Sequence, residues 1–258
     1  MRKQFVKTEN YSRFTTGIAA VEQRGAAEAG MMLVHGAPGL GKSHIVGHWA
    51  TEAGAVFLRA NVDWTPKYFL VELAKVLKVD ASGTAQQLFT RLLERVVEAQ
   101  LPIVIDEAEF TLHNRAVALE KIRDLSDRAE VTVVLIGMDR IQQQISKYKQ
   151  IHGRIAQVVE FKPATLADVA HACEQLAEVR MAPALMAEVH RISGGRMREA
   201  LNVIAAIERI AKLNGLGAVD VPDLEGAPLA FDWQSRTPKT VRAAATGPSR
   251  AACAAGGR

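Results

Sequence analysis

The stretch that decides the fold of this chain is Gly36-Ala37-Pro38-Gly39-Leu40-Gly41-Lys42-Ser43. It matches the pattern G-x-x-x-x-G-K-[ST], in which the backbone N–H groups of a glycine-rich loop surround phosphate. The apolar run Met31–His35 before it predicts a buried strand, and residues 45–53 after it have helical spacing. We therefore predict that all eight residues bind nucleotide phosphates, with Lys42 reaching the β- and γ-phosphates and Ser43 ligating Mg²⁺.

A second motif is Leu101-Pro102-Ile103-Val104-Ile105-Asp106-Glu107, an apolar run that ends in two acids. A buried parallel strand has this continuous apolar character, and ligands collect at its carboxyl end. Asp106 is predicted to hold Mg²⁺, and Glu107 to orient an attacking water or accept its proton. The pair favours hydrolysis of a nucleoside triphosphate such as ATP over small-molecule kinase chemistry, which needs an acceptor site.

Composition sets broad limits on the class of protein. The 258 residues suffice for one α/β domain and a small appendage, and the net charge of +4 permits nucleic-acid binding without demanding it. Two cysteines, Cys173 and Cys253, do not indicate a disulfide framework or a zinc site. No apolar stretch is long enough for a membrane span, and no signal peptide is evident, so we expect a cytoplasmic protein without a membrane partner.

Strand and helix signals alternate from residue 30 to residue 163, which predicts an α/β fold with a parallel sheet flanked by helices. A polar lead-in, 1–29, precedes this core, with a helical stretch near residues 18–29. Three helices without intervening strands follow, which predicts a small all-helical lid at 164–216. Thr165 and Asp168 resemble a helix-capping box, and Pro183 is placed to open a helix. The extension 217–258 becomes a basic, acid-free tail from about residue 235, where we expect disorder.

Together these features resemble the AAA+ ATPases over residues 30–213. The stretch from Ser193 to Leu201 resembles the sensor 2 motif of that family, which implies that Arg198 reaches the γ-phosphate. His152-Gly153-Arg154-Ile155 resembles the segment that carries the arginine finger. The resemblance implies that Arg154 enters the ATP site of a neighbouring subunit, where such an arginine contributes about 10³–10⁵ in rate.

One position departs from the family pattern. Sensor 1 normally places Asn, Thr or Ser at the end of the fourth strand, whereas this chain has Gly137-Met138-Asp139 there. A methionine thioether is a weak hydrogen-bond acceptor, so it cannot hold water or phosphate strongly. Asp139 is the alternative, although its charge repels phosphate unless Mg²⁺ or an arginine offsets it. We therefore expect slow hydrolysis.

Within AAA+ the chain is similar to the transposition regulators, among them the target-selection ATPases called protein B in Mu-like transposing phages. The supporting features are Phe5-Val6-Lys7-Thr8-Glu9-Asn10-Tyr11, the short spacing to the phosphate loop and the single compact module. The resemblance implies a homo-oligomeric ring or filament on double-stranded DNA that selects targets and activates a transposase. Lys67 and Arg115, in loops that follow core strands, are the candidate phosphate contacts.

Three alternatives remain open at this point. A helicase loader of the AAA+ class binds a replicative helicase and prefers single-stranded DNA. A nucleotide-gated scaffold ATPase has no nucleic-acid partner, and its hydrolysis is not stimulated by DNA. A metabolic kinase fits least well, because no acceptor site is evident.

Overall fold

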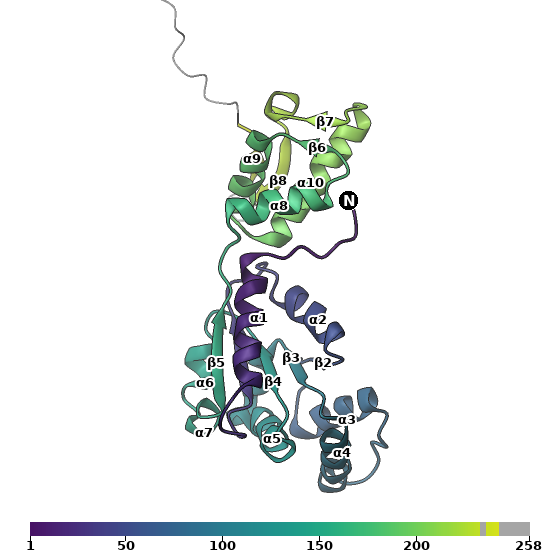
Figure 1. Ribbon diagram of the computed structural model, residues 1–258, viewed down its shortest axis with the longest axis vertical. Helices are drawn as coiled ribbons and strands as arrows, with labels where there is room; N and C mark the ends of the chain where they lie inside the picture. Colours follow the sequence, from purple (N-terminus) through teal and green to yellow (C-terminus); the bar gives the residue numbers. More distant parts are fainter. Residues whose placement is uncertain (233–235, 243–258) are drawn as a thin grey trace, which may run out of the picture. The chain divides into compact units, whose positions relative to one another are not determined.

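The structure is a computed structural model that describes residues 1–232 and 236–242. It divides into two compact units (Figure 1). The first unit contains Phe5–Asp168 together with Arg196–Arg198. The second contains Met1–Gln4, Val169–Gly195 and the described residues from Glu199 onward.

The first unit is built on a five-stranded sheet whose strand order is β2-β3-β4-β1-β5. Every pairing in it is parallel. The strands are β1 (Met31–His35), β2 (Val56–Arg59), β3 (Ile103–Asp106), β4 (Val133–Ile136) and β5 (Ile155–Glu160). This arrangement confirms the α/β fold with a parallel sheet that the alternating pattern predicts. Because all strands run the same way, the loops after β1, β3 and β4 meet at one edge.

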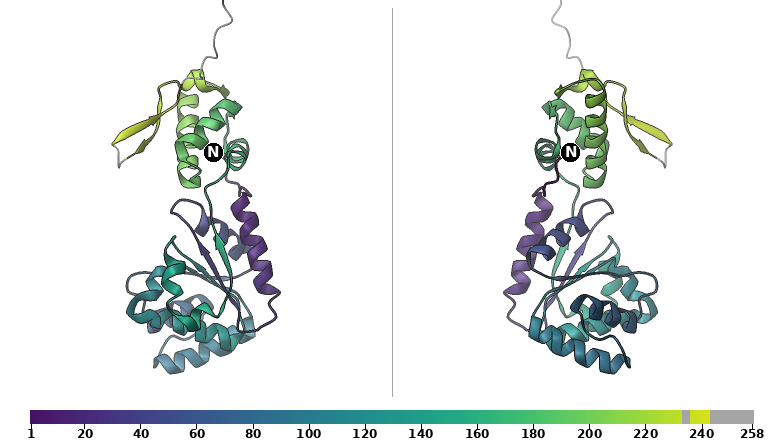
Figure 2. Two further views of the ribbon diagram at one scale, coloured as in Figure 1. Left: turned by 90° about the vertical axis from the view of Figure 1, so that its left-hand side faces the viewer. Right: turned by 90° about the vertical axis from the view of Figure 1, so that its right-hand side faces the viewer.

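Helices cover both faces of this sheet (Figures 1 and 2). Met32 and Val34 of β1 pack on one face with α1 (Glu9–Glu22) and α2 (Lys42–Glu52). Met31 and Leu33 point to the other face. Its covering elements are α3 (Pro66–Leu77), α4 (Ala85–Ala99), η1 (Ala108–Leu112), α5 (His113–Ala129), α6 (Ile141–Ile145) and α7 (Lys149–His152). Strands buried on both faces need apolar residues at every position, which explains the uninterrupted runs.

The N-terminal region differs from the expected lead-in. Its helix, α1, spans Glu9–Glu22 rather than residues 18–29, and it packs against β1 and β5 of the core. Gly17 allows the close approach, since a Cβ there would lie 2.7 Å from Val159 Cγ2 and 2.8 Å from Met32 Cε. Gly25 and Gly30 in the following turn disfavour continuation of the helix.

The second unit is mainly helical, with α8 (Leu166–Leu176), α9 (Pro183–Ser193) and α10 (Met197–Leu213) as its helices. The capping box before α8 is confirmed, because Asp168 N donates to Thr165 Oγ1 at 3.2 Å and Thr165 N donates to Asp168 Oδ2 at 3.1 Å. Pro183 is the first residue of α9, as predicted. The second unit is not all-helical as expected, because it also contains two short parallel strands, β6 (Arg180–Met181) and β7 (Ala218–Val219). Two-residue strands are too short to produce a readable alternation in sequence.

Part of the predicted tail is also ordered. After η2 (Val221–Leu224), strands β8 (Pro228–Asp232) and β9 (Thr237–Thr240) form an antiparallel hairpin. Arg191 of α9 donates to Thr240 O at 2.7 Å, and Lys239 Nζ donates to Ile192 O at 3.2 Å. These tertiary contacts order a segment whose composition favours disorder. The rest of the expected tail, 243–258 with Cys253, lies outside the described residues.

Two further features are the state of Cys173 and the length of the apolar helices. Cys173 is buried and free, so in the described part of the chain it forms no disulfide. Burial raises the pKa of its thiol to about 12. In the same part of the chain, no helix is long and apolar enough to cross a membrane.

Candidate nucleotide-binding site

The phosphate loop connects the carboxyl end of β1 to α2. Gly36, Gly39 and Gly41 have φ values of 146°, 84° and 90°, a region that side chains with a Cβ rarely adopt. At Gly36 a Cβ would also lie 2.6 Å from Phe161 O. Glycine at these positions lets the backbone curl at the N-terminus of α2, where helix-end N–H groups favour anions. The eight predicted residues therefore form one continuous loop and first helical turn.

Lys42 begins α2 and is largely buried. Its Nζ donates to Gly36 O at 2.5 Å and to Ala37 O at 2.9 Å, so the ammonium closes the loop. Burial lowers the pKa of Lys42, and the nearby carboxylates of Asp139, Glu109 and Asp106 act in the opposite direction. An incoming phosphate would offset the same desolvation cost with a direct charge contact.

Ser43 and Asp106 meet although they lie in separate motifs. Ser43 Oγ donates to Asp106 Oδ1 at 3.0 Å, and Asp106 is buried at the end of β3. Two neighbouring oxygens of this kind fit Mg²⁺, which usually takes few protein ligands and completes its shell with water and phosphate. The described residues contain no group of three or more His, Cys, Asp and Glu side chains that could hold a metal ion.

Arg59, at the end of β2, is a site residue that sequence reasoning missed. Its Nη2 and Nε lie 3.1 and 3.3 Å from Asp106 Oδ2, and its Nε lies 3.9 Å from Glu107 Oε1. Parallel pairing of Arg59 with Asp106 across β2 and β3 produces this contact. The only signal in sequence is a charged residue at the end of an apolar strand. Both acids of the second motif therefore have a cationic neighbour in this structure.

Glu107 follows Asp106 in a left-handed conformation, with φ at 55°. Its backbone N–H donates to Asp106 Oδ1 at 3.0 Å, while its own side chain is 51% exposed. The turn thus separates the two carboxylates, so that Asp106 lies in the buried strand end and Glu107 stays accessible to water. This is the division of roles that the sequence predicts for them.

Two further acids lie near the site, Asp139 after β4 and Glu109 in η1. Met138 is 50% exposed, and its backbone N–H donates to the Glu109 carboxylate. Among the carboxylates that raise the pKa of Lys42 against the effect of burial, Asp139 has the largest influence. The charge of Asp139 is therefore close enough to act on Lys42. Glu109, which sequence reasoning also missed, contributes in the same direction. This direction is compatible with Asp139 in place of the usual sensor 1 residue, which stays a prediction.

Arg198 lies beside the phosphate loop. Its backbone N–H donates to Gly39 O at 3.1 Å, and its Cβ lies 3.8 Å from the position that a Gly39 Cβ would take. Its charge adds to the lowering of the Lys42 pKa. The structure therefore brings Arg198 together with the loop, although more than 150 residues separate them in sequence.

Arg154 lies at the edge of the sheet opposite the phosphate loop. It precedes β5 at the amino end of the sheet, where its carbonyl accepts from Met31 N at 3.0 Å. The phosphate loop begins at the other end of β1, a strand of five residues or about 16 Å. An arginine side chain does not span that length. Arg154 Nε instead donates to Asp127, at 3.0 and 3.1 Å from its two carboxylate oxygens.

This geometry leads to a prediction for Arg154→Ala. If Arg154 serves a neighbour's site, the variant keeps its own ATP affinity but loses about 10³-fold or more in hydrolysis. Mixing it with Lys42→Ala protein should restore part of the activity, because mixed interfaces pair an intact loop with an intact arginine. Asp127→Asn is the companion variant, and it should lose less because the guanidinium remains. Co-assembly without any recovery in the mixture contradicts the assignment.

The two DNA-contact candidates are both exposed, but only Arg115 has the irregular backbone of the loop that the sequence predicts for each. Lys67 is exposed in the first turn of α3, after the cap Thr65. Arg115 is exposed in the middle of three consecutive left-handed residues, Asn114 to Ala116, which follow η1. Trp64, which lies in the loop before α3, is only 3% exposed and packs in the core, so its ring is not available for base stacking.

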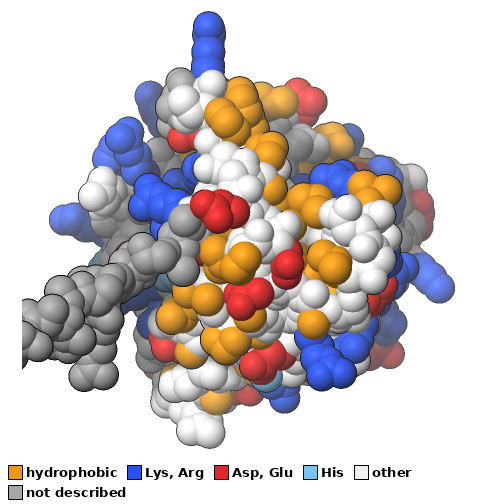
Figure 3. Space-filling view, turned by 90° about the horizontal axis from the view of Figure 1, so that it is seen from above, with side chains coloured by type: hydrophobic (Ala, Val, Ile, Leu, Met, Phe, Trp, Pro, Cys, Tyr) orange, Lys and Arg blue, Asp and Glu red, His pale blue; other side chains and the backbone are white. Residues whose placement is uncertain are grey.

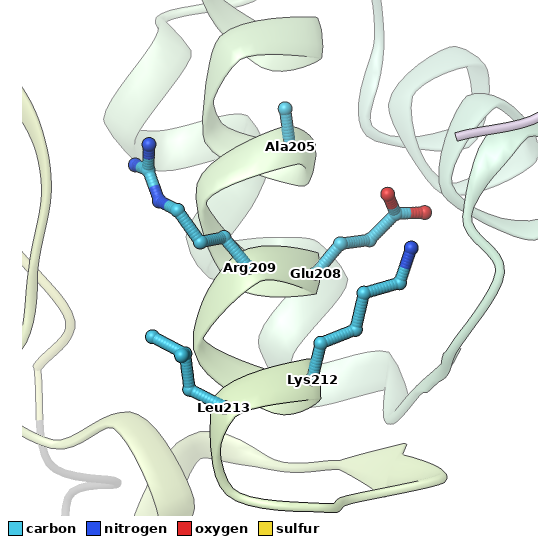
Figure 4. Close-up of a pocket in the computed structure, with 5 residues that line it drawn as sticks. All are labelled: Ala205, Glu208, Arg209, Lys212 and Leu213. Carbon is cyan, nitrogen blue, oxygen red and sulfur yellow. The ribbon is translucent and has the colours of Figure 1, made fainter.

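A separate cavity of about 370 Å³ lies along α10 in the second unit (Figure 4). Its carboxylate, Glu208, already accepts from the Met1 amine at 2.7 Å and from Glu178 N at 2.7 Å. Lys212 donates to Glu178 at 2.8 Å. These charges are satisfied within the unit, so the cavity does not compete with the phosphate loop as a nucleotide site.

Comparison with known families agrees with this geometry. Residues 24–145, a little under half of the chain, match the family described as AAA domain. The matched range includes the phosphate loop, β3 with its two acids, and β4. The chain therefore carries an AAA-type P-loop ATPase domain. A comparison with curated proteins gives no match.

Solved structures share the fold at low sequence identity. Orc1 of Aeropyrum pernix, solved with DNA, has a TM-score of 0.60 and 16% identity over 84% of this chain. Cdc6p of Pyrobaculum aerophilum has a TM-score of 0.63 and 16% identity over 88% of this chain. A mutant RuvB of Thermotoga maritima has a TM-score of 0.57 and 16% identity over 85%. The chain spans 63%, 69% and 68% of these proteins, respectively.

Proposed function

We propose that this protein is an ATP-dependent, largely sequence-independent DNA-binding ATPase that works as a homo-oligomer. The observation that carries the ATPase part is the assembly of Lys42, Ser43 and Asp106, with Glu107 accessible beside them. ATP would be held by the loop Gly36–Ser43. Mg²⁺ would be held by Ser43 and Asp106 and would neutralise phosphate charge. Glu107 would take the proton of the attacking water.

The position of Arg154 supports the proposed oligomer. It cannot reach the nucleotide of its own chain, whereas Arg198 lies at the loop of its own chain. A complete set of cations around the γ-phosphate therefore needs two copies, one with the loop and one with Arg154. Such a head-to-tail contact generates a closed ring or a helical filament. Hydrolysis would then depend on assembly.

Double-stranded DNA is the proposed partner of this oligomer. The net charge of +4 and exposed cations at the carboxyl edge, Lys67 and Arg115, support it. The solved Orc1 structure with the same fold contains DNA. We expect binding to weaken steeply with salt, by about 0.9 logarithmic units of affinity per decade of salt for each phosphate neutralised. The double variant Lys67→Ala/Arg115→Ala should lower that slope by about 1.8 if both residues contact phosphate.

In its finer form the proposal is that the ATP-bound oligomer selects DNA targets and activates a transposase. Its support is the resemblance carried by the N-terminal segment and the single compact ATPase module. The competing function is a helicase loader, which differs in preferring single-stranded DNA. Titration of fluorescent single- and double-stranded oligonucleotides of equal length separates the two. Tighter binding to the single strand would favour the loader.

Electron microscopy with double-stranded DNA is the most informative test of the core proposal. Rings or filaments on DNA are expected with ATP and DNA together, and not with either alone. DNA should also stimulate hydrolysis, because assembly brings Arg154 to the neighbouring site. Assembly that needs neither DNA nor ATP, with unstimulated hydrolysis, would point to a scaffold ATPase instead.

A further inference from the structure

The segment between β4 and β5 has an unusual charge composition. From Arg140 to Val159 it contains no Asp or Glu, although acids make up 28 of the 258 residues of the chain. Besides Arg154, the same stretch carries four basic side chains, which are Arg140, Lys147, Lys149 and His152. We call these four residues the α6–α7 face. No part of the proposed ATPase chemistry uses them.

Packing determines which way this segment faces. Ile141, Ile145 and Ile151 are at most 1% exposed and belong to the main core cluster. Backbone hydrogen bonds hold the turn between the two helices, with Tyr148 N donating to Ile145 O at 2.8 Å and His152 N to Tyr148 O at 2.9 Å. The isoleucines therefore anchor α6 and α7, which Figure 1 shows next to each other beside β5. All four residues of the α6–α7 face are exposed.

In the described part of the chain the cations of this face make no ion pair, unlike those of nearby helices. On α4, Arg91 and Arg95 pair with Asp80 and Glu98, at 2.7 and 2.8 Å. On α5 beyond the left-handed turn, every cation has a carboxylate within 3.6 Å; these cations are Lys121, Arg123 and Arg128. Within residues 1–232 and 236–242, the side chains of the α6–α7 face make no ion pair or hydrogen bond. Their charge is therefore available to an external anion.

The same segment also presents exposed amide side chains. Gln142, Gln143, Gln144 and Gln150 are exposed between the cations and supply neutral donors. Cations and amides together are the groups that contact DNA phosphates without reading sequence. We propose that the α6–α7 face binds the phosphate backbone of double-stranded DNA, an inference that rests on the proposed function.

Charge favours nucleic acid over a second copy of this chain as the occupant. The face carries basic side chains, and the segment from Arg140 to Val159 has no acid of its own, so a polyanion is attracted to it. Many surface carboxylates of the first unit are already paired with cations of their own chain, as on α4 and α5. By contrast, the face shown in Figure 3 intersperses hydrophobic with acidic side chains and has its Lys and Arg mainly toward the edges. That face does not present the same attraction to a polyanion.

The test is the salt dependence of DNA affinity for a charge-removal variant. Arg140→Gln/Lys147→Gln/Lys149→Gln keeps polar side chains at the three positions and leaves the isoleucine anchors intact. The matched control, Lys75→Gln/Arg95→Gln/Arg128→Gln, removes the same charge from residues that have acidic partners. Affinity for a fluorescent duplex is measured by anisotropy between 0.05 and 0.5 M salt, with ATP present. Thermal unfolding and ATP binding check that both variants are folded.

We expect the α6–α7 variant to show a logarithmic slope shallower by about 2.7, or 0.9 for each of three lost phosphate contacts. The control should keep a slope close to that of the unmodified protein. Equal slopes for all three proteins, with duplex bound, would overturn the inference while leaving the proposed function intact. Unmodified protein that binds no duplex would overturn both. A variant that keeps the unmodified slope but no longer forms rings or filaments with ATP and DNA would assign the face to contacts between copies and would overturn the DNA assignment.

Discussion

Glu107→Gln should reduce ATP hydrolysis by about 10²–10⁴-fold, the range for loss of a positioned general base. Glutamine keeps the size and hydrogen bonding of the side chain but cannot accept the proton of the attacking water. ATP binding should persist, because Lys42 closes the loop and the hydrogen bond between Ser43 and Asp106 does not involve Glu107. Single-turnover hydrolysis and nucleotide titration measure the two effects separately.

The control for this variant is Glu94→Gln, which changes an exposed glutamate of α4 outside the site. Its hydrolysis should equal that of the unmodified protein. If ATP holds the oligomer on DNA and hydrolysis releases it, Glu107→Gln should also dissociate far more slowly after dilution into ATP. Release at the normal rate, with hydrolysis blocked, would separate DNA residence from the ATPase cycle. Normal hydrolysis in the variant would remove Glu107 from the mechanism.

Lys42→Ala should weaken ATP binding by about 30- to 5,000-fold, which corresponds to about 2–5 kcal/mol for loss of one partner of a buried charge pair. The phosphates lose the cation that the loop places at its centre. The variant should still fold, because burial lowers the pKa of Lys42 and the charged ammonium is disfavoured in the folded state. The unfolded chain binds the proton more readily, so removing Lys42 removes a cost to folding near neutral pH.

Isothermal titration with a non-hydrolysable ATP analogue measures the affinity, and circular dichroism during heating measures the fold. Lys75→Ala is the matched control, because Lys75 is an exposed lysine on α3 that pairs with Glu72. Unchanged affinity in Lys42→Ala would contradict the assignment of Gly36–Ser43 as the phosphate site. An unfolded variant would contradict the inference about burial, and Lys42→Met would then test affinity with the side-chain volume retained.

Several elements were predictable because local patterns dictate them. The strand Met31–His35 occurs at the predicted residues, and a helix follows the phosphate loop as its spacing predicts. Continuous apolar runs and 3.6-residue periodicity report burial directly, so these elements follow from sequence alone. The grouping of Ser43 with Asp106 was also predictable, since both motifs end parallel strands or follow them, and the carboxyl ends of parallel strands share one edge.

Other features depended on contacts between distant residues. Helix α1 covers the core because Gly17 lets it approach Val159, and no local pattern of the polar lead-in reports that contact. Strand β9 is held by α9, because Arg191 donates to Thr240 O in the strand and Arg242 N, just after the strand, donates to Glu188 Oε2 at 2.9 Å. Composition predicts disorder there because it reports only how little apolar surface the segment itself can bury.

The sequence by itself therefore determined the class of domain, the phosphate loop and the two acids, because each is encoded in a short stretch with a local physical signature. Only the tertiary structure decided that Arg59 lies against Asp106, that Arg198 lies beside the phosphate loop, and that Arg154 lies at the amino end of β5, away from that loop. Strand register and the direction of the chain at each strand end set these positions. Both are properties of the whole sheet, which forms only when segments far apart in the chain pair with one another.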